Sequence, residues 1–239
     1  MNLRRQLLTS ALIQGTGAAA TLLALLLIGA NLGPEAQGLF SRIRAELDFT
    51  AAIASIGIPQ ALFYFLGRAR MSIHSAIKVI LVGSAGSMLA AAVYCSMSTR
   101  WDALPGMVFL LANGVLAMHG NLRGVVLAVS HPARFNVVTA LPQWMLLGYA
   151  LTAVLFGRVA PVDVASAFAL SFGAGVVLGW GSIWRAIPRQ PRADSESTPW
   201  AAMAWYGAAN GLSAGFATGA VLLMLRGLEE VVGAKALGV

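Results

Sequence analysis

The sequence predicts an all-α protein, a polytopic bundle of helices that cross a membrane. Hydrophobic residues make up 58% of the chain and charged residues only 10%, and the mean hydropathy is +0.77. Soluble domains carry charge on about a quarter of their residues, so this composition excludes that class. Uncharged runs also recur along the chain, and each is long enough to cross a ~30 Å hydrocarbon layer at ~1.5 Å per residue.

These uncharged runs predict the membrane spans in order. They cover residues 8–32, 47–67, 79–98, 105–129, 136–156, 164–184 and 200–225, with a start near residue 40 as an alternative for the second. Two charges fall inside these ranges: Asp48 at the start of the second, and Arg123, which interrupts the fourth near its end. Short turns that contain Gly, Pro and charged residues separate the runs, as suits connections at a membrane surface. Pro59 and Pro142 fall inside spans, where a proline bends a helix.

The basic residues indicate an orientation rather than a surface for nucleic acid. The chain carries 16 Lys and Arg and a net charge of +7, but these residues are spread over the turns between apolar spans. With the N-terminus inside, nine Lys and Arg fall in cytoplasmic segments and six on the opposite side, which agrees with the positive-inside rule. We therefore expect a cytoplasmic N-terminus, the lipid bilayer as partner, and no nucleic acid.

An internal repeat predicts how the chain is divided. A shift of 200 residues aligns residues 10–39 with residues 210–239 and matches nine of 30 positions, against roughly three expected by chance in helices rich in Ala, Leu and Gly. The seventh span therefore resembles the first span of a second repeat, and an even number of crossings gives both repeats one orientation. We expect a six-helix lobe at residues 1–184, a cytoplasmic linker at 185–199 and the start of a truncated second lobe at 200–239.

Polar side chains on the second span form the first candidate site. At about 100° per residue, Arg42, Glu46 and Gln60 share one stripe of a helix. Arg44 and Asp48 lie on the opposite side, four residues apart, and are expected to pair at the outer interface. Arg42 and Glu46 are the candidates for a cavity, because polar residues of membrane helices usually face the bundle interior. The alternative is that all four charges lie above the hydrocarbon and are solvated.

Two further candidates are amides inside other spans. Gln14 lies in the first span and Asn113 in the fourth, and such residues either line a polar cavity or hold helices together. Three histidines and one cysteine give no metal-ligand spacing. No phosphate-binding loop or catalytic set of side chains stands outside the spans. The sequence therefore predicts neither an enzyme nor a bound cofactor.

The start of the chain resembles a known transporter family. A turn at Gly33, the sequence GLFS at 38–41, a membrane helix, and the sequence GIPQA at 57–61 before basic residues follow in that order. They are similar to the first helical hairpin of polysaccharide flippases in the multidrug/oligosaccharidyl-lipid/polysaccharide exporter superfamily. The resemblance implies a MATE-like arrangement of two six-helix lobes around a central cavity in the inner membrane. It also implies a polyprenyl-diphosphate-linked oligosaccharide as substrate, moved outward by alternating access, with Arg42 suited to the diphosphate.

The resemblance leaves several points open. Coupling to Na⁺ or H⁺ occurs in the superfamily, and nothing in the sequence fixes the ion; proteins of polysaccharide assembly are further partners that it suggests. A multidrug exporter of the same superfamily is one alternative, and it would be expected to show cavity acids, for which Glu46 and Asp48 are available. A membrane-embedded enzyme of glycan assembly, a polymerase or ligase, is another. It would need a long outer loop with catalytic side chains, and the outer turns here are short.

Overall fold

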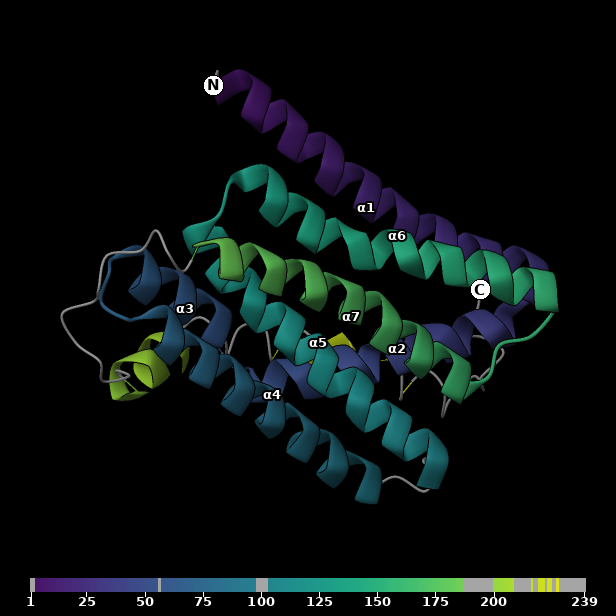
Figure 1. Cartoon of the computed structure of the whole chain (residues 1–239). Coiled ribbons are helices and arrows are strands. Elements are labelled where there is room, and N and C mark those ends of the chain that lie inside the picture. Colours follow the sequence, from purple (N-terminus) through teal and green to yellow (C-terminus); the bar gives the residue numbers. More distant parts are fainter. Residues whose placement is uncertain are drawn as a thin grey trace.

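The computed structural model describes residues 3–55, 57–97, 103–186 and 200–208, and single positions between 216 and 227. Its main helices are α1 (Leu3–Leu32), α2 (Pro34–Ala54), α3 (Ile58–Gly67), α4 (Ile73–Ser96), α5 (Ala103–Val129), α6 (Pro132–Phe156) and α7 (Pro161–Ala186). They pack side by side as one bundle (Figure 1). No β-strand occurs within these described ranges, and the predicted helical class is confirmed.

Most of these helices are suited to a membrane. α1 from Leu8 onward, α4, α6 and α7 are long and apolar enough to cross one by themselves, and α2 with α3 meets the same criterion as one bent span. Large apolar side chains cover the outside of the bundle; Leu89, Leu155 and Leu170 are 67%, 82% and 70% exposed. Such a surface is unfavourable in water, whereas lipid tails accept it. The chain is a multi-pass membrane protein.

Helix α5 is the central helix of the bundle. It contacts α2, α3, α4, α6 and α7, and Figure 1 shows it in the middle of the bundle. It carries Asn113, His119, Asn121 and Arg123, and it is not among the helices apolar enough to cross a membrane alone. Because its neighbours shield it from lipid, a central helix can keep such residues. The predicted span at 105–129 is therefore a helix, although it does not meet the criterion for crossing a membrane by itself.

The second predicted span, residues 47–67, is not one continuous helix. The chain bends by 49° between α2 and α3. Gly57 adopts the left-handed conformation (φ 63°) before α3, and Pro59 stands in the first turn of α3, where its missing N–H suits a helix start. The bend expected at Pro59 is thus a full break. Helix α6, in contrast, continues through Pro142.

Short capped turns reverse the chain between successive spans. Ser72 caps α4, its hydroxyl accepting a hydrogen bond from the N–H of Ser75 at 3.1 Å. Gly157 ends α6 in the left-handed conformation, with φ 68°, and Pro161 opens α7. As a result α1, α4 and α6 begin at the end of the bundle where α3, α5 and α7 finish (Figure 1).

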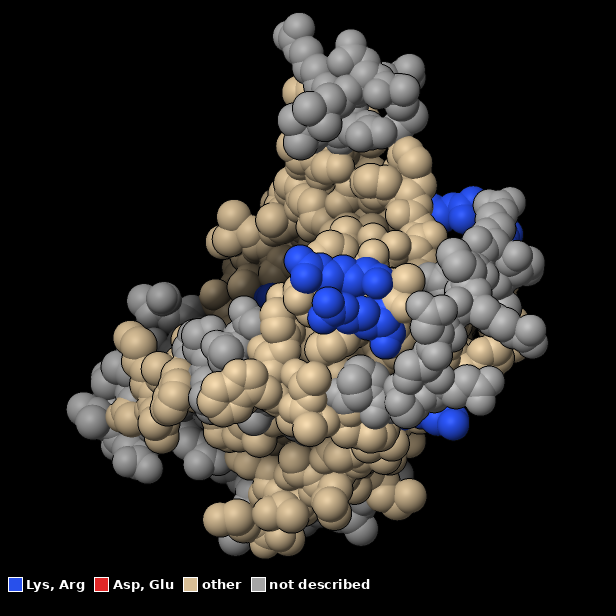
Figure 2. Space-filling model, turned by 90° about the vertical axis from the view of Figure 1, so that its left-hand side faces the viewer, with Lys and Arg blue, Asp and Glu red and all other residues tan. Residues whose placement is uncertain are grey.

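The two ends of the bundle differ in charge. One end, the basic end, holds Arg68, Arg70, Lys78, Arg134 and Arg185 and no acid among the described residues. The other, the paired end, holds the ion pairs Arg42–Glu46, Arg44–Asp48 and Arg158–Asp163. Figure 2 views the basic end, where Lys and Arg are visible and no Asp or Glu is. By the positive-inside rule, we expect the basic end to face the cytoplasm.

Cysteines introduced on a Cys95→Ser background should report this orientation. Ala69, in the turn after α3, lies at the basic end, and Ala160, just before α7, lies at the paired end. In intact cells we expect an impermeant maleimide to label Ala160→Cys but not Ala69→Cys, and to label both after permeabilisation. Labelling of Ala69→Cys alone in intact cells would invert the assignment.

The predicted linker and seventh span lie mostly outside the described residues. Residues 200–208 are helical and pack against α3, with Met203 buried and the rings of Tyr206 and Tyr64 stacked 4.7 Å apart. A Cβ atom on Gly57 would overlap the backbone of Gly207. The break between α2 and α3 is therefore in close contact with the segment that follows the linker.

Candidate functional site

The bundle has two apolar cores, one toward each end. The core at the paired end includes Phe40, Leu47, Phe109 and Phe168, and the core at the basic end includes Leu62, Ile80, Leu122 and Ile183. Every one of these side chains is 1% exposed or less. Burial of this kind stabilises each half of the bundle by close packing. Between the two cores, the helices carry small and polar side chains instead of large apolar ones.

A layer of small and polar residues separates the cores, and we call it the polar layer. It consists of Ser55 and Gly57 at the α2–α3 break, Ser84 and Ser87 on α4, His119 and Asn121 on α5, Thr139 and Gln143 on α6, and Ser171 and Gly175 on α7. Polar groups inside a membrane bundle are costly, and they usually hold helices together or bind what the protein transports.

Contacts across the polar layer join neighbouring helices. The Nε2 atom of His119 lies 2.9 Å from a backbone carbonyl oxygen of α6, and Gly175 of α7 packs against the same imidazole. On the other side of α5, the amide of Asn121 lies against Gly83 of α4, which also faces Ile58, the first residue of α3. The absence of side chains at Gly83 and Gly175 leaves room for these polar groups.

Two of the predicted candidates form a buried ion pair on α2. The Nε atom of Arg42 lies 3.6 Å from a carboxylate oxygen of Glu46, and the side chains are 17% and 3% exposed. Arg44 and Asp48 pair at 3.6 Å as well, but their side chains are 35% and 42% exposed. The structure therefore separates an inner pair from an outer pair, as the helical period predicts. Desolvating an ion pair costs free energy, which makes the inner pair a functional candidate.

Asn113 connects α5 to two other helices near this pair. Its side-chain N–H groups donate to the hydroxyl of Thr50 and, at 3.3 Å, to the carbonyl oxygen of Leu47. Its side-chain oxygen accepts a hydrogen bond from the hydroxyl of Ser87 on α4. Thr50 in turn donates to the carbonyl oxygen of Glu46 at 2.7 Å. A polar path thus runs from the backbone of the inner pair into the polar layer.

Gln14 belongs to a separate contact between α1 and α6. Its side-chain Nε2 donates to the Oδ1 atom of Asn136 at 3.0 Å, and the Nδ2 atom of Asn136 donates to the hydroxyl of Ser10 at 2.6 Å. Gly17, one turn on, lies against Gln143. These bonds hold α1 onto the bundle. The structure gives Gln14 a packing role and does not bring it to the inner pair.

Gln60 is not on the same face as Arg42 and Glu46. It is exposed on α3, beyond the break, and α3 points in a different direction from α2. The predicted stripe assumed one continuous helix, and the helical period does not carry over from α2 to α3 because the helix is broken between them. The predicted alignment of Gln60 with the inner pair is therefore wrong.

Several polar atoms of the polar layer have no hydrogen-bond partner among the described residues. They are both amide atoms of Asn121, the hydroxyls of Ser55 and Thr139, and the Oε1 atom of Gln143, and all are buried. Each unpaired buried group costs about 1–3 kcal/mol, so such groups are rare. Of these residues, Ser55 lies at the break itself, and Asn121 faces Gly83, which also meets Ile58 of α3. Unpaired donors and acceptors beside a helix break are suited to water, an ion or the polar part of a substrate.

Ser84 and Ser87 of the polar layer were not predicted as site residues from the sequence. Their spacing could have indicated them, because two serines about one turn apart on an otherwise apolar span mark the polar side of a helix. The partner of Ser87 on α5, Asn113, becomes visible only from the packing of α4 against α5, and Ser84 bonds to the carbonyl oxygen of Ile80 on its own helix. Among the residues that the structure describes, no group of three His, Cys, Asp or Glu could hold a metal ion.

Comparisons with protein families, with curated proteins and with solved structures find no match for this chain.

The two asparagines of α5 should respond differently to the same substitution. Both are fully buried, but Asn113 bonds to α2 and α4, whereas the amide of Asn121 has no partner among the described residues. We expect Asn113→Leu to cost about 1–3 kcal/mol, and Asn121→Leu to be neutral or stabilising because leucine removes two unpaired atoms. Thermal unfolding of the full chain in detergent measures both. An equal loss for the two variants would contradict the assignment.

Proposed function

We propose that this chain forms one lobe of an alternating-access transporter that moves lipid-linked oligosaccharides across the inner membrane. The observation that carries the proposal is the polar layer at the level of the α2–α3 break. Broken helices next to buried polar groups are the usual binding regions of secondary transporters. The resemblance of residues 33–61 to polysaccharide flippases supplies the substrate class. A second lobe would complete the cavity.

Arg42 is the residue that we assign to the substrate's diphosphate. Its guanidinium is permanently charged and forms strong paired hydrogen bonds with phosphate oxygens. Glu46 lies 3.6 Å from it and limits the cost of burying its charge while no substrate is bound. A diphosphate would replace the Glu46 carboxylate as the partner of Arg42. The pair therefore gives the site a preference for anions without leaving a bare cation in the bundle.

The buried carboxylate of Glu46, 2% exposed, favours a multidrug exporter as the second candidate function. In such a protein, a buried acid binds a cationic drug or carries a proton. Here the charge of Glu46 is compensated by Arg42, which weakens its attraction for a cation. An anionic substrate fits the pair better.

Deletion of the gene for the complete protein distinguishes the two functions. For a flippase, we expect surface polysaccharide to disappear and lipid-linked oligosaccharide to accumulate in the inner leaflet, where lectins reach it only after permeabilisation. For a multidrug exporter, surface polysaccharide stays normal and sensitivity to cationic dyes rises. Normal surface polysaccharide in the deletion strain would contradict the flippase proposal.

A further inference from the structure

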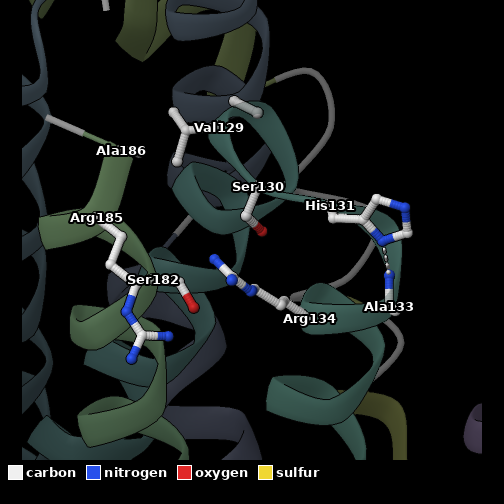
Figure 3. Close-up of a pocket in the computed structure, with 9 residues that line it drawn as sticks. Val129, Ser130, His131, Ala133, Arg134, Ser182, Arg185 and Ala186 are labelled. Carbon is white, nitrogen blue, oxygen red and sulfur yellow. Dashed lines mark hydrogen bonds between the residues drawn. The ribbon is translucent and has the colours of Figure 1, made fainter. Parts of the chain in front are cut away.

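A pocket of about 600 Å³ opens at the basic end, between the ends of α5, α6 and α7. Ser130, Arg134, Ser182 and Arg185 supply its polar lining. Figure 3 shows Arg134 reaching from α6 toward Ser130 and Ser182, with Arg185 beside Ser182 on α7. His131 serves a separate purpose, since its Nδ1 atom accepts a hydrogen bond from the first turn of α6.

The described lining of the pocket carries an excess of positive charge. Among the residues that the structure describes, no acid lines the pocket, and the ion pairs found among them all lie at the paired end, so Arg134 and Arg185 take part in none of those pairs. Each helix terminus acts as about half a charge, so the C-termini of α5 and α7 and the N-terminus of α6 sum to about −0.5. Two guanidiniums outweigh that value, and they repel each other unless an anion lies between them.

We propose that this pocket binds a phosphate anion, supplied by the headgroup of an anionic phospholipid. Two guanidiniums match phosphate oxygens, and basic pockets between the ends of membrane helices suit such headgroups. The hydroxyls of Ser130 and Ser182 bond to carbonyl oxygens of their own helices and can turn to donate to the ligand. The inference does not depend on the proposed transport activity.

The position of the pocket favours a lipid headgroup, rather than a free anion, as its ligand. It lies at the end of spanning helices, where headgroups are found. The residues next to it in the chain include Trp184 and Leu127, which are 66% and 40% exposed. Tryptophan is typical of the boundary between lipid and water. A free anion would need no such apolar surroundings.

The test measures lipid retention by the purified full chain. The protein is purified in the presence of equal amounts of phosphatidylglycerol and phosphatidylcholine, and native mass spectrometry gives the ratio of the two lipids that remain bound. We expect wild type to retain more phosphatidylglycerol than phosphatidylcholine. In the double variant Arg134→Gln/Arg185→Gln, we expect this ratio to fall about tenfold. The matched control is Arg70→Gln/Lys78→Gln, which removes the same charge from the same end outside the pocket and should keep the preference within about twofold.

Each outcome decides the proposal. An equal loss in both double variants would mean that the whole basic end attracts anionic lipid diffusely, and would overturn the site. No preference in wild type would overturn it as well. If inorganic phosphate at millimolar concentration displaces the lipid and stabilises the wild type against heat as much as phosphatidylglycerol does, the phosphate in the pocket comes from a free anion and not from a headgroup.

A second double variant, Arg134→Lys/Arg185→Lys, keeps both charges and should retain most of the preference for phosphatidylglycerol. Such a result shows that substitution at these two positions does not by itself unfold the protein.

Discussion

Replacing Arg42 by alanine should abolish export by the complete protein, whereas Arg44→Ala should leave it close to the wild-type level. The two residues are two positions apart on one helix, but Arg42 is the inner one, 17% exposed against 35%. If Arg42 meets the diphosphate, its loss removes the charge-assisted hydrogen bonds that hold the substrate. Arg42→Lys should retain part of the activity, because a point charge still attracts phosphate without the bidentate geometry. The measurement is surface polysaccharide in a deletion strain, normalised to protein in the membrane fraction.

A second variant separates transport from stability. Arg42→Ala leaves the carboxylate of Glu46 buried without its charged partner, which costs about 3–5 kcal/mol. The double variant Arg42→Ala/Glu46→Ala removes both charges and should recover most of that loss without recovering export. Normal export by the double variant would show that the inner pair is structural. If Arg44→Ala abolishes export while Arg42→Ala exports normally, the face of α2 that meets the substrate is the one that carries Arg44.

A methyl group at Gly124 should destabilise the bundle by about 3 kcal/mol or more, which is the upper part of the range for overpacking. A Cβ atom built there would overlap the carbonyl group of Pro59, and backbone gives way less easily than a side chain. Pro59 lies in the first turn of α3, so the clash pushes the break away from α5. Expression level and thermal unfolding in detergent measure the effect.

Gly120 provides the control one turn earlier on the same helix. A Cβ atom there would have no heavy atom within 4 Å. Gly120→Ala should therefore be neutral or gain roughly 0.5–1 kcal/mol from the lower entropy of the unfolded chain. If Gly124→Ala and Gly120→Ala unfold at the same temperature, the close approach of α3 to α5 does not exist in the folded protein.

Much of the helix layout could be predicted from the sequence because lipid imposes a simple rule on length and apolarity. The span expected at 136–156 corresponds to α6 (Pro132–Phe156), and the one at 164–184 to α7 (Pro161–Ala186). The break at Gly57 was not predicted as a break, because the apolar run continues across it and hydropathy carries no information about backbone dihedral angles. Gly57 and Pro59 carried the signal, but a glycine and a proline also occur within unbroken membrane helices.

The candidate site could be predicted only as far as one helix determines it. The inward position of Arg42 and the pairing of Arg44 with Asp48 follow from the helical period over a single turn. The alignment with Gln60 failed because it extended that period across the break. The bonds of Asn113 depend on how α5 packs against α2 and α4, and no local pattern contains that information.

The uneven charge of the two ends has a consequence for how firmly the protein keeps its orientation after insertion. Moving one elementary charge across a membrane potential of 100 mV changes the energy by about 2.3 kcal/mol. Arg68, Arg70, Lys78, Arg134 and Arg185 lie at the basic end without a described acid, and for these five alone, turning the bundle over in a membrane that is negative on that side costs on the order of 10 kcal/mol from the potential. At the paired end, neighbouring opposite charges cancel and contribute little to this energy. An energised membrane therefore holds the bundle in one orientation for as long as the potential lasts, and losing a single arginine leaves most of that bias in place.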